Sequence, residues 1–418
     1  MIKLFHPSCN LQAKIQISGS KSESNRWLIL QALYPEIQKI HNLSNSEDTQ
    51  TLQKALKLFQ NNPRNQHEPL DINIGHAGTA MRFLTAYFAI QPQSHVQLSG
   101  SHRMHQRPIN PLVQALDQLG CQIEYAHHQD YPPLFIQGRD IEKNQTEIQA
   151  DMSSQFISAL MLIAPKLPNG LEITLKEKLT SQTYVEMTIK QLQHIGIPVD
   201  WNNNIIKVHH VQKVDKQDVR VESDWSSASY WYAMMALSNQ AQLELNHFQQ
   251  NSLQGDYILK DIYEKYFGVK TIFQDGILIL SKIEDFILPV FIELNLNAFP
   301  DLAQTIAVTC AGLNIQLNLK GLETLKIKET NRLQAMQNEL NKLNIKSTIT
   351  DDSLQLLEFS QYEENTMIET YQDHRMAMSF AVLALKKPLI IKDENVVDKS
   401  YPKFWQDLKS AGFEIELY

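Results

Sequence analysis

Cysteine is scarce in this 418-residue sequence. The three cysteines, Cys9, Cys121 and Cys310, are far apart, odd in number and form no CxxC pair. Small disulfide-stapled domains need paired cysteines at short spacings, so this usage argues against a disulfide framework. We expect three reduced thiols in a reducing compartment.

Long apolar runs and long basic runs are also absent. No stretch approaches the roughly 18 apolar residues of a membrane span, and the start MIKLFHPSCN lacks the pattern of a signal peptide. The net charge is -8 and the basic residues are dispersed, which argues against wholesale binding of nucleic acid. From these absences we expect a soluble, cytoplasmic protein. Because 418 residues with 43% hydrophobic content exceed one ordinary core, we also expect two domains.

Arginine is the third scarce residue, since only nine of the 38 basic residues are arginine. Six of the nine lie in short motifs rich in Gly, Ser, Thr or Pro, at positions 26, 82, 103, 107, 332 and 375. A planar guanidinium matches carboxylate and phosphate oxygens better than an ammonium does. This distribution predicts local anion recognition, with buried structural ion pairs as the alternative for individual arginines.

One arginine motif, GSKSESNR at residues 19–26, precedes the apolar run WLILQAL. A glycine turn, serine hydroxyls, Lys21 and Arg26 at the start of a predicted helix place donors and positive charge together. Such a helix start is a site for an anion. The alternative is an N-capped surface helix with solvated charges.

Helix starts of this kind recur at intervals of about 70 residues, which indicates an internal repeat. They lie near Lys21, Gly78, Ser153, Ser226, Asp301 and Asp373, and the segments DMSSQFISALML and DWSSASYWYAMM resemble each other directly. Runs such as 95–100, 171–175 and 241–248 predict strands between them. Second helices are predicted near residues 48, 110, 181 and 329, and the polar segment 61–69 is predicted to be a loop. The sequence therefore predicts an α+β fold of six similar units.

Nine motifs that cover nearly the whole chain carry a family resemblance. They are GSKSESNR (19–26), GHAGTAMR (75–82), HRMHQRP (102–108), MSSQF (152–156), ESDWSSASY (222–230), FPDLAQT (299–305), KETNR (328–332), DHRMAM (373–378) and DKSYP (398–402). In this order they resemble the 5-enolpyruvylshikimate-3-phosphate synthase family.

The resemblance implies an inside-out α/β barrel fold with two similar domains, each made of three sheet-and-helix repeats. One domain is discontinuous and comprises residues 1–19 plus 224–418. The other, residues 20–223, is inserted into it and carries most of the residues for shikimate 3-phosphate. The active site is expected in the cleft between them.

The reaction implied by the resemblance moves the enolpyruvyl group of phosphoenolpyruvate to the 5-hydroxyl of shikimate 3-phosphate. Phosphate leaves through a tetrahedral intermediate, and the product serves the shikimate pathway to chorismate and the aromatic amino acids. The family needs no metal or organic cofactor, and the inhibitor glyphosate competes for the phosphoenolpyruvate pocket. The implied partners are these two small molecules, with no nucleic acid or membrane, and the implied state is a monomer.

The resemblance also assigns roles to individual residues. Shikimate 3-phosphate would be held by Lys21, Ser22, Arg26, Ser153, Ser154, Gln155, Ser181, Tyr184, Asp301, Thr324 and Lys328. Phosphoenolpyruvate would be held by Lys21, Gly78, Arg107, Arg332, Arg375 and Lys399. The candidate catalytic residues are Asp301, as the base for the 5-hydroxyl, and Glu329 and Lys21, for proton transfer at the methylene carbon.

Local sequence patterns offer plainer interpretations of some of these residues. Asp301 after Pro300 has the pattern of a helix N-cap, and Glu329 that of an ion-pair partner for Arg332. His102 and His105 have HxxH spacing but no third ligand, so we predict no zinc site.

Four residues depart from the family pattern. His76 stands where Asn is usual, Phe83 where Pro is frequent, Thr324 where Asn is frequent, and Asn331 where Asp is usual. None of these departures removes a predicted cation or the candidate base, so they bear on substrate affinity and inhibitor response. Asn331 is expected to weaken an ion pair that steadies Arg332.

Two other functions remain as alternatives. A sister transferase that acts on UDP-N-acetylglucosamine typically has a Cys near the phosphoenolpyruvate-binding Arg, whereas the segment SHRMHQRP has none. A catalytically silent anion-binding protein with the same fold would be expected to lose members of the charged set. All of that set is present: Lys21, Arg107, Asp301, Glu329, Arg332, Arg375 and Lys399.

Overall fold

A computed structural model describes residues 1–62 and 68–418. Most of the segment predicted to be a loop, 61–69, lies outside the described residues. The chain forms two compact units, which we call the discontinuous unit (Met1–Gly19 with Glu222–Tyr418) and the inserted unit (Ser20–Val221). The division at 221–222 lies two residues before the boundary that the resemblance implies. Each unit has its own apolar core.

The inserted unit contains two four-stranded sheets and a two-stranded one among the described residues. In spatial order these are β4 (Leu70–Asn73), β5 (His95–Ser99), β7 (Leu134–Gln137) and β6 (Gln122–Tyr125); β8 (Gln145–Gln149), β9 (Leu171–Lys176), β11 (Ile205–Val208) and β10 (Val199–Asn202); and β12 (Gln217–Arg220) with β3 (Ile37–His41).

The discontinuous unit contains three four-stranded sheets. They are β2 (Asn10–Ile15), β13 (Gln240–Asn246), β15 (Ile277–Lys282) and β14 (Val269–Gln274); β16 (Phe291–Asn295), β17 (Gln316–Lys320), β19 (Leu354–Phe359) and β18 (Ile345–Ile349); and β20 (Thr366–Ile368), β21 (Leu389–Ile391), β1 (Ile2–Phe5) and β22 (Glu414–Leu417).

All these sheets share one pairing pattern. The first two strands named in each are parallel, and the remaining pairs of the four-stranded sheets are antiparallel. A parallel pair needs a crossover, and a helix supplies it between β4 and β5, β8 and β9, β16 and β17, and β20 and β21. The common pattern confirms the six similar units predicted from the sequence.

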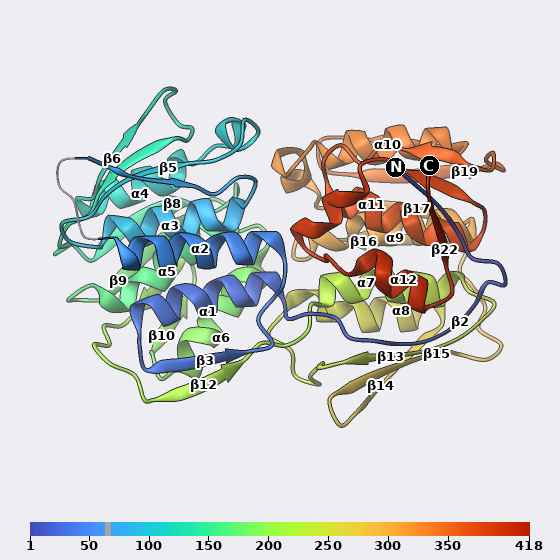
Figure 1. The fold of residues 1–418 in the computed structure, drawn as a ribbon, viewed down its shortest axis with the longest axis horizontal. Helices are drawn as coiled ribbons and strands as arrows, with labels where there is room; N and C mark the ends of the chain where they lie inside the picture. The colour runs from blue at the N-terminus through green and yellow to red at the C-terminus, as the bar shows by residue number, and fades with distance from the viewer. Residues whose placement is uncertain (63–67) are drawn as a thin grey trace. The chain divides into compact units, whose positions relative to one another are not determined.

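Two sets of helices accompany the sheets. The inner helices, each leading into the second strand of a parallel pair, are α1 (Lys21–Leu33), α3 (Gly78–Ala89), α5 (Ser154–Ile163), α7 (Trp225–Leu237), α9 (Ala303–Leu313) and α11 (His374–Ala381). The outer helices are α2 (Glu47–Asn61), α4 (Asn110–Leu119), α6 (Gln182–His194), α8 (Leu259–Phe267), α10 (Arg332–Lys342) and α12 (Phe404–Ser410). In the inserted unit α1, α2 and α3 lie side by side (Figure 1).

Inner helices are buried along most of their length, as a helix in the middle of a core must be. Every residue of α3 is buried, and α7 is buried except at Ser226. Their predicted starts are confirmed to within about two residues. The second helix predicted near residue 329 begins instead at Arg332, because the Asn331 side chain caps it by accepting from the Gln334 N–H at 3.3 Å.

No helix in the described part of the chain is both long and apolar enough to cross a bilayer. The same residues contain no group of three or more His, Cys, Asp or Glu side chains placed to hold a metal ion.

Candidate active site

The start of α1 gathers polar groups in the inserted unit. Ser20 caps the helix by accepting from the Glu23 N–H at 3.4 Å. The Lys21 ammonium lies 3.6 Å from the carboxylate of Asp48, in the first turn of α2, and both side chains are largely buried. Ser22 is half-buried beside them. This geometry places the predicted cation and hydroxyl at a helix N-terminus.

Arg26 is directed into the core of the inserted unit. Its Nε donates to Thr188 Oγ1 at 2.7 Å, and its Nη2 donates to Ser158 Oγ at 3.0 Å and to the Tyr184 carbonyl at 3.1 Å. Its Nη1 donates to the Ser22 carbonyl at 2.8 Å. Burial lowers the pKa of Arg26 to about 10, so it is a cation at neutral pH. These contacts use all but one of the guanidinium hydrogens, and the remaining one is on Nη1.

Gly78 opens α3, and the guanidinium of Arg107 lies directly against it. A Cβ at position 78 would stand 2.5 Å from Arg107 Nη1 and 3.1 Å from its Cζ. Arg107 is 9% exposed, and its Nε has no hydrogen-bond partner among the described residues. Ala77 provides no side-chain cap for this helix. A cation and uncapped helix N–H groups therefore meet where an anion can bind.

Arg82 holds the backbone on both sides of this pair. Its Nη1 donates to the Gly78 carbonyl at 3.2 Å and its Nη2 to the Pro108 carbonyl at 3.1 Å. The sequence marked Arg82 as part of a motif but assigned no role to it. Its contacts indicate a positioning role, because Arg82 holds the backbone of Gly78 and Pro108 on either side of Arg107.

The predicted shikimate 3-phosphate residues at 153–155 form the start of α5. Ser153 caps the helix by accepting from the Gln155 N–H at 3.3 Å, and Ser154 is buried. Gln155 Nε2 donates to Thr79 Oγ1 at 3.2 Å, which joins the starts of α5 and α3. Hydroxyls and an amide thus converge on one end of two neighbouring helices.

Ser181 and Tyr184 lie at the start of α6. Ser181 is buried and has left-handed backbone geometry with φ of 53°. Tyr184 is half-buried, and its carbonyl accepts from Arg26. The two residues therefore belong to the neighbourhood of Arg26.

Arg332 is the centre of the polar cluster in the discontinuous unit. Its Nε donates to Asp373 at 2.7 Å, its Nη1 to Asp301 at 2.9 Å and its Nη2 to Glu329 at 2.9 Å. Arg332 is 1% exposed, and Asp373 is fully buried. The nearby carboxylates raise the pKa of Arg332 against the opposing effect of burial, which lowers it. The predicted ion pair between Glu329 and Arg332 is confirmed.

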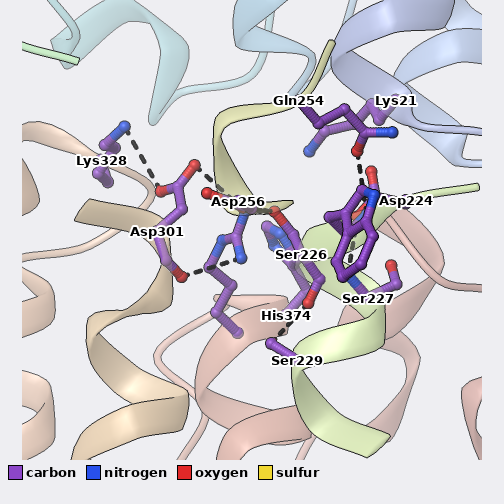
Figure 2. Close-up of polar contacts among 12 residues, drawn as sticks. Lys21, Asp224, Ser226, Ser227, Ser229, Gln254, Asp256, Asp301, Lys328 and His374 are labelled. Atoms are coloured by element: carbon purple, nitrogen blue, oxygen red, sulfur yellow. Dashed lines mark hydrogen bonds and ion pairs between the residues drawn. The ribbon is translucent and has the colours of Figure 1, made fainter. Parts of the chain in front are cut away.

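Asp301 contacts two further cations. Its carboxylate lies 3.2 Å from Arg375 Nη2. It also lies 3.7 Å from Lys328 Nζ (Figure 2). The N-cap interpretation of Asp301 is wrong, because the residue lies within the 3-10 helix Pro300–Leu302, and the N-cap positions of that helix and of α9 are Phe299 and Leu302. Its oxygens are drawn to the cations instead. Burial lowers the pKa of Lys328, which favours its neutral form relative to an exposed lysine.

Glu329 links Arg332 to Lys399. Its Oε2 accepts from Arg332 Nη2, and its Oε1 lies 2.9 Å from Lys399 Nζ. Lys399 ends the 3-10 helix Glu394–Lys399 and is buried. Every cation and carboxylate that the sequence predicted in this unit therefore belongs to one cluster.

Two of the family departures lie in the same unit. Thr324 is buried, and its hydroxyl has no hydrogen-bond partner within the described part of the chain. The expectation for Asn331 is not met, because its side chain caps α10 and the ion pairs of Arg332 are made by other residues.

The other two departures make contacts in the inserted unit. The Phe83 ring lies under Arg26, with its centroid 5.4 Å from the guanidinium carbon. His76 Nδ1 is 2.9 Å from Ser101 Oγ, and the Ser101 N–H donates to the Gly75 carbonyl at 2.9 Å. His76 thus helps to join the loop before α3 to the segment that leads to Arg107.

Sequence reasoning missed the role of Asp373. It identified the residue only as a helix start, yet the carboxylate both caps α11, by accepting from the Arg375 N–H at 2.9 Å, and pairs with Arg332. The DHR order within its motif was the available signal, since an acidic residue before a helix start is typical of a cap.

A comparison with solved structures identifies the fold. A solved structure of EPSP synthase from Acinetobacter baumannii covers the whole of both chains with a TM-score of 0.77 at 21% identity. The protein is therefore a two-domain α/β protein of that fold.

The family follows from the sequence comparisons. The family model described as EPSP synthase (3-phosphoshikimate 1-carboxyvinyltransferase) matches residues 5–408. A Bacteroides fragilis protein named 3-phosphoshikimate 1-carboxyvinyltransferase is 40% identical over 425 residues, covering 99% of this chain and 98% of its own. A Haemophilus influenzae protein of the same name is 33% identical over 439 residues, covering 96% and 97%. The chain belongs to the EPSP synthase family.

The contacts of Asp373 predict a large effect on stability. Asp373→Ala should lower the free energy of unfolding by about 3 kcal/mol, because Arg332 stays buried with one carboxylate fewer and α11 loses its cap. Urea unfolding of purified protein measures this change. Asp351→Ala is the control, since that carboxylate pairs with Lys326 but is 96% exposed, and no measurable loss is expected. Equal losses in both variants would contradict the assignment.

Proposed function

We propose that this protein transfers the enolpyruvyl group of phosphoenolpyruvate to the 5-hydroxyl of shikimate 3-phosphate. The products are 5-enolpyruvylshikimate 3-phosphate and phosphate. The observation that carries the proposal is the Asp301 carboxylate held among Arg332, Arg375 and Lys328 in a chain of this family. The names and near-full coverage of the relatives support the same reaction.

Phosphoenolpyruvate carries a carboxylate and a phosphate, so its site must supply several cations. In the discontinuous unit we assign this role to Arg375, Lys399 and the Nη1 hydrogen of Arg332 that Asp301 does not use. In the inserted unit we assign it to Arg107 and Lys21, with Gly78 making room for the guanidinium. Arg107 is suited to the role because it is buried without a carboxylate partner among the described residues.

Shikimate 3-phosphate needs donors for a phosphate and for ring hydroxyls. The start of α5, with Ser153, Ser154 and Gln155, supplies hydroxyls, an amide and helix N–H groups. We assign the remaining contacts to Lys21, Ser22, Arg26, Ser181, Tyr184, Asp301, Thr324 and Lys328. The buried Thr324 hydroxyl supports its place in this set, since a polar group without a partner costs stability unless a ligand uses it.

Three residues are candidates for proton transfer. Asp301 is the candidate base for the 5-hydroxyl, because its carboxylate accepts protons and the surrounding cations fix its position. Glu329 and Lys21 are the candidates at the methylene carbon, which is protonated when the tetrahedral intermediate forms and deprotonated when it collapses.

The assignment of Asp301 predicts a loss of turnover. Phosphate release by the wild type should require both substrates, and Asp301→Asn should lower kcat by about 10²- to 10⁴-fold because the base is lost while the shape is kept. A coupled phosphate assay measures both. Asp351→Asn, on the exposed Lys326 pair, is the matched control and should keep full activity.

Other outcomes of this assay identify what fails. Full activity in Asp301→Asn would move the base elsewhere, with Glu329 as the next candidate. Release only with UDP-N-acetylglucosamine as acceptor would favour the sister transferase. No release with either acceptor would favour a catalytically silent anion-binding protein.

Gly78 predicts a selective effect on phosphoenolpyruvate. Gly78→Ala should raise the KM for phosphoenolpyruvate about ten- to a hundredfold, because the new Cβ displaces the Arg107 guanidinium from its position. The melting temperature should stay equal or rise, since the atoms met belong to the end of a flexible side chain and Ala favours the helix. A lowered melting temperature with an unchanged KM would contradict the proposal.

The family resemblance also supports a cytoplasmic monomer. Sedimentation of the purified chain should give the single-chain mass of 48.1 kDa. A mass near twice that value at micromolar concentration would overturn the monomer.

A further inference from the structure

Asp256 lies close to the cluster of Asp301 and Arg375 but belongs to none of the nine motifs. It is part of the 3-10 helix Gly255–Ile258, between β13 and α8, and is 6% exposed. Its carboxylate accepts a hydrogen bond from the hydroxyl of Ser226, the second residue of α7 (Figure 2). A buried carboxylate beside a proposed substrate site calls for a physical account.

Arg375 connects this pair to the site. Its Nη2 lies 3.3 Å from Ser226 Oγ and 3.2 Å from Asp301 Oδ2, and its Nη1 donates to the Asp301 carbonyl at 3.1 Å. The guanidinium is thus held by Asp301 on one side and by Ser226 on the other.

The direction of the Ser226 hydroxyl follows from the chemistry of its neighbours. An ionised carboxylate only accepts hydrogen bonds, and a guanidinium only donates them. The single Ser226 O–H therefore points to Asp256, and its lone pairs face Arg375. With Asp256 protonated, the carboxyl can donate to Ser226, and the hydroxyl hydrogen is released to turn toward the cation.

We propose that Asp256 is a positioning residue for Arg375, which it orients through the Ser226 hydroxyl. The inference rests on the proposed role of Arg375 in holding phosphoenolpyruvate. It assigns Asp256 and Ser226 to the affinity for that substrate and to no step of proton transfer.

The charges around Asp256 set the pH range of this effect. The groups that face it are Asp301, Arg375, Ser226 and Asp224, from three different segments. Burial, together with the charge of Asp301, raises the pKa of Asp256 to about 6, while Arg375 and Ser226 act in the opposite direction. Asp256 is therefore ionised above about pH 6, and the Ser226 hydroxyl loses its fixed direction below it.

Asp256 can be altered without releasing its loop. Gln254 anchors the same segment independently, since its Oε1 accepts from the Trp225 N–H at 3.0 Å and its Nε2 donates to the Ser223 carbonyl at 2.8 Å. Burial also disfavours the ionised carboxylate, so a neutral amide at position 256 should not weaken the fold at neutral pH. A positioning role is thereby separable from a structural one.

The test compares wild type with Asp256→Asn, Ser226→Ala and the double variant. Calorimetry measures the Kd for phosphoenolpyruvate in the presence of a shikimate 3-phosphate analogue that lacks the 5-hydroxyl and so cannot accept the enolpyruvyl group, and phosphate release measures both KM values. Each single variant should weaken phosphoenolpyruvate affinity about tenfold, the scale of one hydrogen bond to a charged group. The double variant should be no weaker than either single one, because the two residues act in series. The KM for shikimate 3-phosphate and the melting temperature should not change.

A pH series provides the readout that a structural role would not give. As the pH falls through about 6, the wild type should lose phosphoenolpyruvate affinity relative to Asp256→Asn. The ionisation of the ligand is the same for both proteins at each pH, so the ratio of their Kd values reports on Asp256. Asp261→Asn, in α8 on an exposed pair with Lys260, is the matched control and should follow the wild type.

Three results would overturn the proposal. They are unchanged phosphoenolpyruvate affinity in Asp256→Asn, an equal weakening of both substrates together with a lower melting temperature, and no binding of phosphoenolpyruvate by the wild type. A wild type that binds phosphoenolpyruvate but releases no phosphate would instead refute the proposed function, and the ratio of Kd values would still decide the role of Asp256.

Discussion

The buried guanidinium of Arg332 is the interaction on which the polar site of the discontinuous unit depends. It pairs with Asp301, Glu329 and Asp373, which come from the segments before α9, α10 and α11. An unpaired buried charge lowers the stability of the fold, so removing either the arginine or one of its carboxylates leaves the remaining charges unfavourably buried. The ends of two successive repeats are thereby tied to each other. Asp301 and Glu329 still present their other oxygens to Arg375 and Lys399.

The inserted unit treats its arginines differently. Arg26 is held by hydroxyls and carbonyls, and Arg107 rests on Gly78 without a carboxylate partner among the described residues. Cations that are not neutralised by carboxylates keep their charge available for an anionic ligand. The paired cluster, by contrast, holds three carboxylates around Arg332. The two units thus hold different sets of charged groups on the same repeat.

The repeat explains why polar residues collect at helix starts. In each unit an inner helix such as α3 is buried along its length, so a polar side chain in its interior must find a partner there, as Arg82 does with the Gly78 and Pro108 carbonyls. Helix N-terminal N–H groups need acceptors, and Ser153, Asp224 and Asp373 provide them as caps. The same positions are suited to an anionic ligand, because helix N-terminal N–H groups and nearby cations attract anions.

Several features were predictable because they are local in the chain. The inner helix starts follow from small polar residues before apolar runs, and the pair of Glu329 with Arg332 follows from a spacing of three residues. Asp301 was harder. The local sequence has the pattern of a helix cap after proline, but the cations that pair with the Asp301 carboxylate lie 27 to 74 residues further along the chain.

By itself the sequence determined the α/β repeat, the family and the set of charged residues, because periodicity, spacing and motif order are properties of neighbouring residues. Only the tertiary structure decided which charges meet. It brought Asp373 to Arg332 and Asp256 to Ser226, and it placed the Arg107 guanidinium on Gly78. Such pairings depend on contacts between separate elements, and the energy of a charged group depends on its burial and partners more than on its neighbours in the chain.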